Sequence, residues 1–245
     1  KMNDIGHVEI ATDTPVPMDP YAFSRDTGGF LLVDRVSRDT VAAGMCRYAL
    51  RRAHNVVPHA FTVDRDARAL LKNQRARVLW LTGLPGAGKS TIADALERHL
   101  LGLGLHTYVL DGDSVRTGLN KDLGFTPEDR AENVRRVAET AKLMLDAGLI
   151  VIVSLVSPFR GDRRAAKELF QPGDFLEVFV DTPAEVVVER DPKGLYAKAK
   201  AGTLPNMTGV GQGYERPESP DAVVSGAGDV DEAVALLLRA LEIES

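Results

Sequence analysis

The sequence predicts an α/β fold in which helices flank a parallel β-sheet, and three observations support this prediction. From residue 77 onward, short apolar runs of strand length alternate with segments whose apolar residues recur every three or four positions. The run at 149–153 is apolar throughout, as expected for a strand buried on both faces of a parallel sheet. A glycine-rich segment at 83–91 separates the first strand of this series from its first helix.

The individual elements follow from local signals. Strands are expected at 77–82, 107–110, 149–153 and 175–180, and helices at 92–101 and 230–241. A long helix is expected to begin after Thr126, because Pro127 fits its first position and acidic residues follow in its first turn. Its apolar residues recur every three or four positions, so one face packs on the sheet, and Gly148 ends it.

The first 60 residues have a different character. Strands are expected at 6–12 and 29–34, separated by the turn-rich segment 13–20. Two or three short strands are too few for a stable sheet, so this part is interpreted as the end of a larger β-domain that begins before residue 1. The predicted domains are therefore 1–60, the end of a β-domain with a linker, and 61–245, in which a short helix at 64–73 leads into the first strand.

The glycine-rich segment is predicted to be a phosphate-binding loop, because it lies between a strand and a helix. Its glycines let successive backbone N–H groups point inward, and the helix N-terminus adds partial positive charge. Lys89 is expected to reach the β- and γ-phosphates, and Ser90 to place its hydroxyl on Mg²⁺. The sequence thus predicts that a nucleoside triphosphate and Mg²⁺ are bound by a nine-residue loop: Gly83, Leu84, Pro85, Gly86, Ala87, Gly88, Lys89, Ser90 and Thr91.

Composition excludes several classes of protein. A formal net charge of −5 argues against a nucleic-acid-binding protein, which would normally be basic. No apolar run approaches the ~18 residues that span a bilayer, so no membrane association is expected. The single cysteine, Cys46, cannot form an internal disulfide, which fits the cytoplasm, and it receives no role. His54 and His59 have no ligand partner in the nearby sequence and are interpreted as ordinary surface residues.

Three polar clusters follow predicted strands. Asp111 and Asp113 come directly after the second strand. One carboxylate can lie near Mg²⁺ and the other can accept a proton from an attacking hydroxyl. A turn with solvated acidic side chains would have the same pattern. Arg130 and Asn133 share one helical face, which suits a substrate phosphate or sulfate. Ser157 can donate to phosphate oxygens, although serine is common at strand ends.

Four segments carry a resemblance to the adenylylsulfate kinase family: 111–125 (DGDSVRTGLNKDLGF), 128–133 (EDRAEN), 156–160 (VSPFR) and 190–196 (RDPKGLY). The resemblance covers about residues 75–245. It implies a P-loop kinase with a five-stranded parallel sheet. The implied reaction is ATP-dependent phosphorylation of the 3′-hydroxyl of adenosine 5′-phosphosulfate, which gives 3′-phosphoadenosine 5′-phosphosulfate.

The resemblance also implies roles for individual residues. Asp113 is the implied base and acts with Lys89 and Ser157 in catalysis, whereas Ser90 and Asp111 hold the metal. The implied sulfonucleotide site consists of Asp111, Arg116, Phe125, Arg130, Asn133, Val156, Ser157, Lys193 and Met207. Residues 190–196 and the loop through Tyr214 correspond to a lid. Met207 stands where the family usually has a phenylalanine that stacks on adenine, and Pro85 and Ala87 replace small hydroxyl residues of the loop.

The N-terminal part resembles the last β-barrel strands of the large, GTP-binding subunit of sulfate adenylyltransferase, on segments 3–7, 19–21, 27–35 and 40–45, so the resemblance implies that residues 1–60 are a β-barrel fragment with a linker. That enzyme makes adenosine 5′-phosphosulfate. The resemblance implies a C-terminal part of a bifunctional sulfate-activation enzyme, with the small adenylyltransferase subunit as its partner in the full-length enzyme and a homodimeric kinase.

Two other functions remain as alternatives. The first is a P-loop kinase for another small metabolite, such as a nucleoside or a sugar acid. The second is a GTPase-type switch, which the sequence disfavours. The Asn-Lys-x-Asp pattern that reads guanine is absent, since residues 120–122 lack its spacer, and the Asp-x-x-Gly match at 191–194 lies too far along the chain.

Overall fold

The computed structural model describes residues 6, 8, 10, 16–47, 59, 61–191, 194–203 and 207–243. The chain forms two compact units, Lys1–Ala60 and Phe61–Ser245. Among the described residues, no helix is long and apolar enough to cross a membrane.

The first unit contains a short helix, α1 (Arg25–Gly28), and an antiparallel hairpin of β1 (Gly29–Val33) and β2 (Thr40–Met45). The strand expected at 29–34 is therefore present, whereas most of the strand expected at 6–12 lies outside the described residues. Apolar side chains such as Leu31 and Val41 are exposed on the hairpin. Two strands with exposed apolar side chains do not make a stable sheet by themselves.

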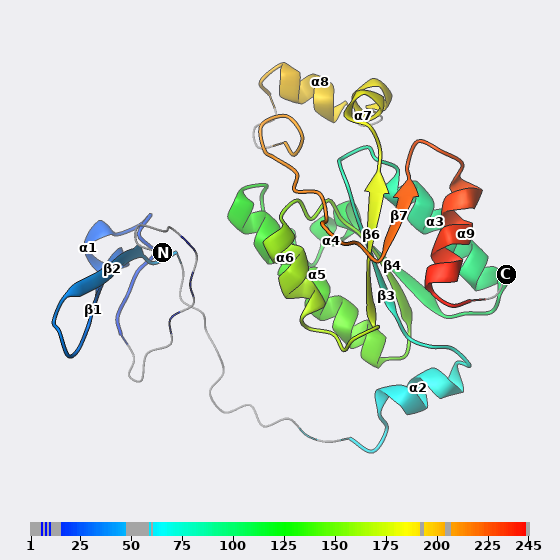
Figure 1. The fold of residues 1–245 in the computed structure, drawn as a ribbon, viewed down its shortest axis with the longest axis horizontal. Coiled ribbons are helices and arrows are strands. Elements are labelled where there is room, and N and C mark those ends of the chain that lie inside the picture. The colour runs from blue at the N-terminus through cyan, green and yellow to red at the C-terminus, as the bar shows by residue number, and fades with distance from the viewer. Residues whose placement is uncertain are drawn as a thin grey trace. The chain divides into compact units, whose positions relative to one another are not determined.

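The second unit is built on a five-stranded sheet with the order β4-β5-β3-β6-β7, in which every pairing is parallel (Figure 1). The strands are β3 (Val78–Thr82), β4 (Thr107–Asp111), β5 (Ile150–Ser154), β6 (Phe175–Asp181) and β7 (Ala222–Ser225). The predicted five-stranded parallel sheet is confirmed. Four of these strands match the apolar runs in the sequence.

Helices cover both faces of this sheet (Figure 1). α3 (Lys89–Gly102) and α9 (Val230–Ala240) cover one face, and α5 (Pro127–Asp146) and α6 (Arg160–Lys167) cover the other. The central strand β3 shows why: Leu79 and Leu81 pack in the core of the first face, and Val78 and Trp80 in that of the second. Alternate side chains of a strand point to opposite faces, so a fully apolar strand needs a helix layer on each side.

The long helix α5 begins and ends as the sequence predicts. The Thr126 side chain accepts a hydrogen bond from the Asp129 N–H (3.2 Å), and Pro127 occupies the first turn. Gly148, just beyond the helix, has a φ of 82°, which glycine adopts without steric cost. A separate short helix, α2 (Arg65–Leu71), precedes β3.

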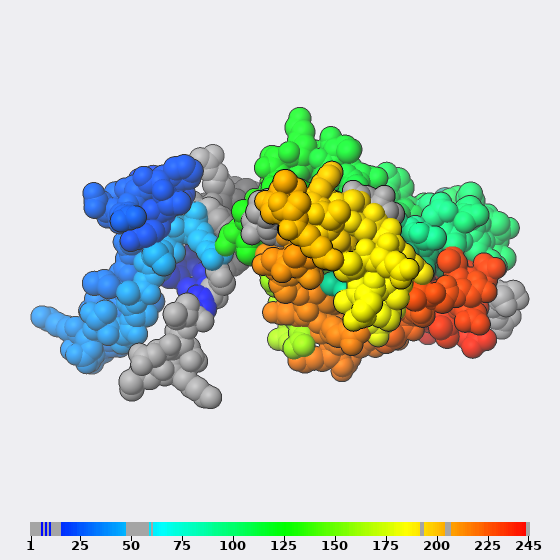
Figure 2. Space-filling model, turned by 90° about the horizontal axis from the view of Figure 1, so that it is seen from above, coloured from blue at the N-terminus to red at the C-terminus, as the bar shows by residue number. Residues whose placement is uncertain are grey.

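Three further helices, α4 (Gly112–Thr117), α7 (Ala184–Arg190) and α8 (Leu195–Lys200), follow strands β4 and β6. Figure 1 places α7 and α8 beyond the carboxyl end of the sheet, and the view from above in Figure 2 shows this yellow and orange part of the chain in front. The carboxyl edge of the sheet is where α/β proteins of this type bind ligands.

Candidate active site

The glycine-rich loop 83–88 connects β3 to α3 at the carboxyl edge of the sheet. Gly83 has a φ of 156°, and a Cβ atom there would lie 2.6 Å from the Val180 carbonyl oxygen. Near the end of the loop, a Cβ atom on Gly226 would lie 1.8 Å from the Ala87 carbonyl oxygen. The same oxygen accepts a hydrogen bond from the Thr182 hydroxyl (2.8 Å). The loop is therefore held between β6 and the turn that follows β7.

Two side chains at the start of α3 are directed to this loop and to the neighbouring strand end. The Lys89 ammonium group donates to the carbonyl oxygens of Gly83 (3.0 Å) and Leu84 (2.8 Å). The Ser90 hydroxyl donates to Asp111 Oδ2 (2.8 Å) and lies 3.2 Å from Ser154 Oγ. Asp111 and Ser154 end the adjacent strands β4 and β5, so three oxygen-bearing side chains meet at this point.

This oxygen cluster fits Mg²⁺, which prefers hard oxygen ligands and uses only one or two protein carboxylates beside substrate phosphates. Ser90, Asp111 and Ser154 supply oxygen donors alone. Among the described residues, no group of three or more His, Cys, Asp or Glu side chains could hold a metal ion. The arrangement therefore suits a nucleotide-bound Mg²⁺ rather than a metal caged entirely by protein.

A cavity of about 100 Å³ lies beside this cluster, and we name it the arginine pocket. Its lining includes seven residues that were predicted to bind substrate or to act in catalysis: Asp113, Arg116, Phe125, Arg130, Asn133, Val156 and Ser157. Gly112, Val134, Leu155 and Pro158 complete it. Asp111 joins the cavity to the glycine-rich loop, because its side chain contacts Ser90 and also accepts from the Asp113 N–H (3.0 Å).

Two guanidinium groups flank one aromatic ring in the arginine pocket. Arg116 Cζ lies 4.5 Å and Arg130 Cζ lies 5.4 Å from the centre of the Phe125 ring, which is 50% exposed. Arg116 is held by the carbonyl oxygens of Leu123 (3.0 Å) and Gly124 (2.8 Å).

The two arginines are partly desolvated. Burial, and secondarily the charge of Arg116, lowers the pKa of Arg130 to about 10. Burial also lowers the pKa of Arg116, against the opposing effect of Asp129 and Asp113. Because these two like charges flank one ring, an anionic ligand bound between them would reduce their mutual repulsion.

The other walls of the pocket depend on buried hydrogen bonds. Asn133 Oδ1 accepts from Asn120 Nδ2 (3.0 Å), which ties α5 to the turn after α4. Ser157 is 3% exposed, and its hydroxyl oxygen accepts from Trp80 Nε1 (3.0 Å). No role was expected for Trp80, because its apolar strand context predicts a core residue and carries no sign of this contact.

The structure does not bring all of the predicted residues together. Met207 is 5% exposed and belongs to the apolar cluster that also contains Tyr196, outside the lining of the arginine pocket. The Tyr196 hydroxyl donates to the Pro85 carbonyl oxygen (3.0 Å), so this part of the chain touches the glycine-rich loop. Lys193 lies outside the described residues.

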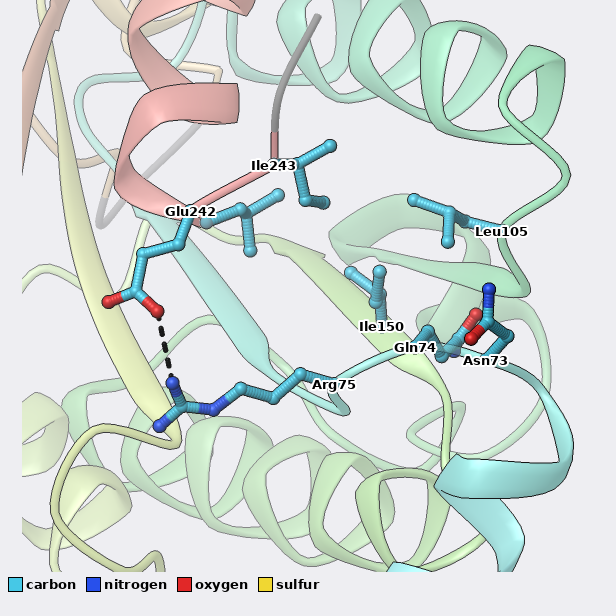
Figure 3. A pocket seen from close by; sticks show the side chains of 8 residues that line it. Asn73, Gln74, Arg75, Leu105, Ile150, Glu242 and Ile243 are labelled. Carbon is cyan, nitrogen blue, oxygen red and sulfur yellow. Dashed lines mark hydrogen bonds and ion pairs between the residues drawn. The ribbon is translucent and has the colours of Figure 1, made fainter.

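A larger cavity of about 230 Å³ lies at the opposite, amino end of the sheet, where β5 begins (Figure 3). Figure 3 shows Ile150, Leu105 and Ile243 around it, with the Arg75–Glu242 ion pair (3.0 Å) at one side. Its lining residues offer no paired carboxylates or phosphate-binding loop. Seven of the predicted site residues line the smaller cavity, and no predicted site residue that the structure describes lines this one.

Two known families match parts of this chain. Residues 75–225 match the family Adenylylsulphate kinase, and residues 1–47 match the GTP-eEF1A C-terminal domain-like family. The chain is 54% identical over 191 residues to an adenylyl-sulfate kinase of Vibrio cholerae. The aligned region covers 78% of this chain and 89% of that relative.

A longer relative matches nearly the whole chain. The bifunctional enzyme NodQ of Rhizobium sp. (strain BR816) is 56% identical over 240 residues, which are 98% of this chain but 38% of the relative. The chain thus spans well under half the length of this bifunctional relative. Among solved structures, the Mycobacterium tuberculosis APS kinase CysC in complex with AMPPNP and APS has a TM-score of 0.66 and 45% identity, and the match covers 69% of this chain and 98% of that one.

Proposed function

The chain belongs to the adenylylsulfate kinase family, and we propose that it transfers the γ-phosphoryl group of ATP to the 3′-hydroxyl of adenosine 5′-phosphosulfate (APS). The observation that carries this proposal is the arginine pocket, which joins the glycine-rich loop through Asp111. A phosphate-donor site beside a cationic pocket with one aromatic ring suits an anionic nucleotide as the acceptor. The Mycobacterium tuberculosis relative was solved with APS and AMPPNP bound.

On the donor side, backbone N–H groups of the segment 83–91 and the Lys89 ammonium group bind the β- and γ-phosphates. Ser90 and Asp111 hold Mg²⁺, which neutralises charge on the phosphates when it is bound. Lys89 is already directed over the loop by its bonds to the carbonyl oxygens of Gly83 and Leu84. Phosphoryl transfer needs mainly this positioning and charge stabilisation.

On the acceptor side, Arg116 and Arg130 bind the anionic groups of APS, and Phe125 stacks on its adenine. Asp113, in the first turn of α4, accepts the proton of the 3′-hydroxyl. Asn133, Val156 and Ser157 form the remaining wall of the pocket. The roles of Lys193 and Met207 in the acceptor site stay predictions.

The test is turnover of ATP by the purified protein with and without APS, with a nucleoside and a sugar acid as competing acceptors. We expect ADP formation that depends on APS and on Mg²⁺, and little activity when GTP replaces ATP. Phosphorylation of the sugar acid or the nucleoside instead of APS would support another small-metabolite kinase. GTP hydrolysis that needs no acceptor would support a switch protein.

We also propose that the kinase is the C-terminal part of a bifunctional sulfate-activation enzyme of the cytoplasm, that it forms a homodimer, and that its adenylyltransferase part pairs with a separate small subunit. The match of residues 1–47 to an elongation-factor-type C-terminal domain supports the bifunctional enzyme. The NodQ relative of Rhizobium, which is named as bifunctional, supports it as well.

The proposed division at residues 60 and 61 predicts that the kinase works alone. Every residue of the proposed site lies after residue 82, and the hairpin of the first unit contributes none of them. A chain that begins at Phe61 should therefore keep kcat and both KM values within about twofold of those of the longer chain. Loss of activity or precipitation of the shorter chain would show that residues 1–60 dock on the kinase.

A further inference from the structure

Ser157 has a backbone conformation that needs support. Its φ is 37°, in the left-handed region that a residue with a Cβ atom rarely adopts. Such a conformation persists only where the surrounding structure over-determines it, and it is often found at functional sites. Ser157 lines the arginine pocket between Val156 and Pro158, so its conformation decides the shape of that wall.

Arg163, on α6, supplies much of this support. Its side chain is 2% exposed, and its Nη1 donates to the Ser157 carbonyl oxygen (2.7 Å). Its Nε donates to Glu177 Oε1 on β6 (2.6 Å), and its Nη2 donates to the Glu215 carbonyl oxygen (2.8 Å). The planar guanidinium group holds these three acceptors in one fixed geometry, which a lysine cannot reproduce.

Glu215 makes two further hydrogen bonds with residues that follow Ser157. Its backbone N–H donates to the Pro158 carbonyl oxygen (2.9 Å), so the residue after Ser157 is held as well. The Glu215 carboxylate accepts from the Arg160 N–H at the start of α6 (2.8 Å). Arg163 and Glu215 therefore hold the segment 157–158 from α6 and from the segment before β7.

Trp80 holds the same residue from the sheet. Its Nε1 donates to Ser157 Oγ, and its ring stacks on Phe175 at 5.5 Å. Trp80 is fully buried, and it is the only tryptophan in the sequence. Its fluorescence is therefore a direct report on the environment of Ser157.

We propose that Arg163 is a positioning residue for the acceptor, which holds Ser157 in its left-handed conformation and so fixes the wall of the arginine pocket. Arg163 does not line the pocket and acts through the Ser157 carbonyl group and, by way of Glu215, through Pro158. The proposal rests on the proposed function in one respect, namely that the acceptor is APS.

The test compares Arg163→Lys with Arg164→Lys, the same change at the next, exposed position of α6. We expect Arg163→Lys to raise the KM for APS about tenfold or more, because the wall loses its geometry, and to change the KM for ATP less than twofold. Arg164→Lys should change neither. A purely structural role would lower the melting temperature without separating the two KM values.

Trp80 fluorescence gives a second readout that needs no ligand. Arg163→Lys should change the emission spectrum in the same direction as Ser157→Ala, which removes the acceptor of the indole N–H. Arg164→Lys should leave the spectrum unchanged. This measurement separates the two proposals: if the unaltered protein does not phosphorylate APS, the proposed function fails, while the spectra still test the positioning role.

Removing the arginine could leave Glu177 as an uncompensated buried charge and prevent folding. The double change Arg163→Met with Glu177→Met replaces the buried pair by apolar side chains of similar length and should fold, with the same rise in the KM for APS. Glu177→Gln keeps an acceptor for Nε and should give a smaller rise. An unchanged KM for APS and an unchanged spectrum in any folded Arg163 variant would overturn the proposal.

Discussion

The proposed donor side and the proposed acceptor side of this site are built in different ways. The donor side is one continuous segment, 83–91, in which the loop backbone and the first turn of α3 would bind phosphate. The acceptor side is assembled from three separate segments, around α4, at 125–134 and at 155–158. A contiguous loop can be recognised from its own sequence, whereas an assembled pocket depends on contacts between distant residues.

The two sides also use charge differently. Lys89 is largely buried and directed to carbonyl oxygens of its own loop. Arg116 and Arg130 flank a half-exposed ring, and burial together with the charge of Arg116 lowers the pKa of Arg130. The comparison therefore predicts that changes on each side affect one substrate and spare the other.

The largest effect is expected for Lys89→Ala. Removing the cation that meets the developing phosphoryl charge should lower kcat by about a thousandfold or more. Circular dichroism and the melting temperature should stay close to those of the unaltered protein. Lys142→Ala, at an exposed position of α5, is the matched control and should keep full activity. Near-normal turnover by a folded Lys89→Ala protein would contradict the assignment of the loop.

Phe125→Ala should weaken APS binding by about ten- to a hundredfold, because base–aromatic stacking contributes roughly 1–3 kcal/mol. The ring is half exposed, so stability should change little. Leu119→Ala is the control. Leu119 is as exposed as Phe125, lies like it in the segment between α4 and α5, and is absent from the pocket lining. Calorimetric titration with APS and with an ATP analogue would measure both affinities. A loss of ATP affinity alone would reverse the assignment of the two sides.

Gly226→Ala tests the donor side through a residue that contacts the glycine-rich loop but does not belong to it. The added methyl group would meet the Ala87 carbonyl oxygen, so the glycine-rich loop must shift. We expect the KM for ATP to rise about tenfold and the KM for APS to stay within about twofold, since a misplaced binding loop loses alignment with its ligand. Gly102→Ala is the control, because a Cβ atom there meets nothing within 4 Å. Equal effects on both substrates would mean that the two sides are not independent.

Local signals explain what could be predicted from the sequence. The glycine-rich loop, the apolar run of β5 and the N-cap at Thr126 each depend on neighbouring residues alone. The residue patterns did not reveal β7, because this four-residue edge strand is largely exposed and its apolar run is only three residues long. The fifth strand came only from the family resemblance.

Long-range interactions explain what was missed on the acceptor side. Arg163 contacts Glu177 and Glu215, which lie 14 and 52 positions further along the chain. Trp80 contacts Ser157 across 77 positions. A charged residue in a helix pattern indicates an exposed face, and a tryptophan in an apolar strand indicates a core residue. Neither pattern carries information about a partner on a different element.

Met207→Phe should give the smallest effect and decides to which side Met207 belongs. The resemblance places this residue over the adenine of APS, whereas the structure places its side chain in the apolar cluster with Tyr196, which contacts the glycine-rich loop. Because that cluster is closely packed, a phenyl ring should cost about 1–3 kcal/mol of stability by overpacking. The KM for APS should change less than twofold, since Met207 is absent from the pocket lining.

Met207→Leu, which nearly conserves volume, should leave the melting temperature and both KM values unchanged. A several-fold fall in the KM for APS at an unchanged melting temperature would show that residue 207 covers the acceptor, and the acceptor side would then include a fourth segment of the chain.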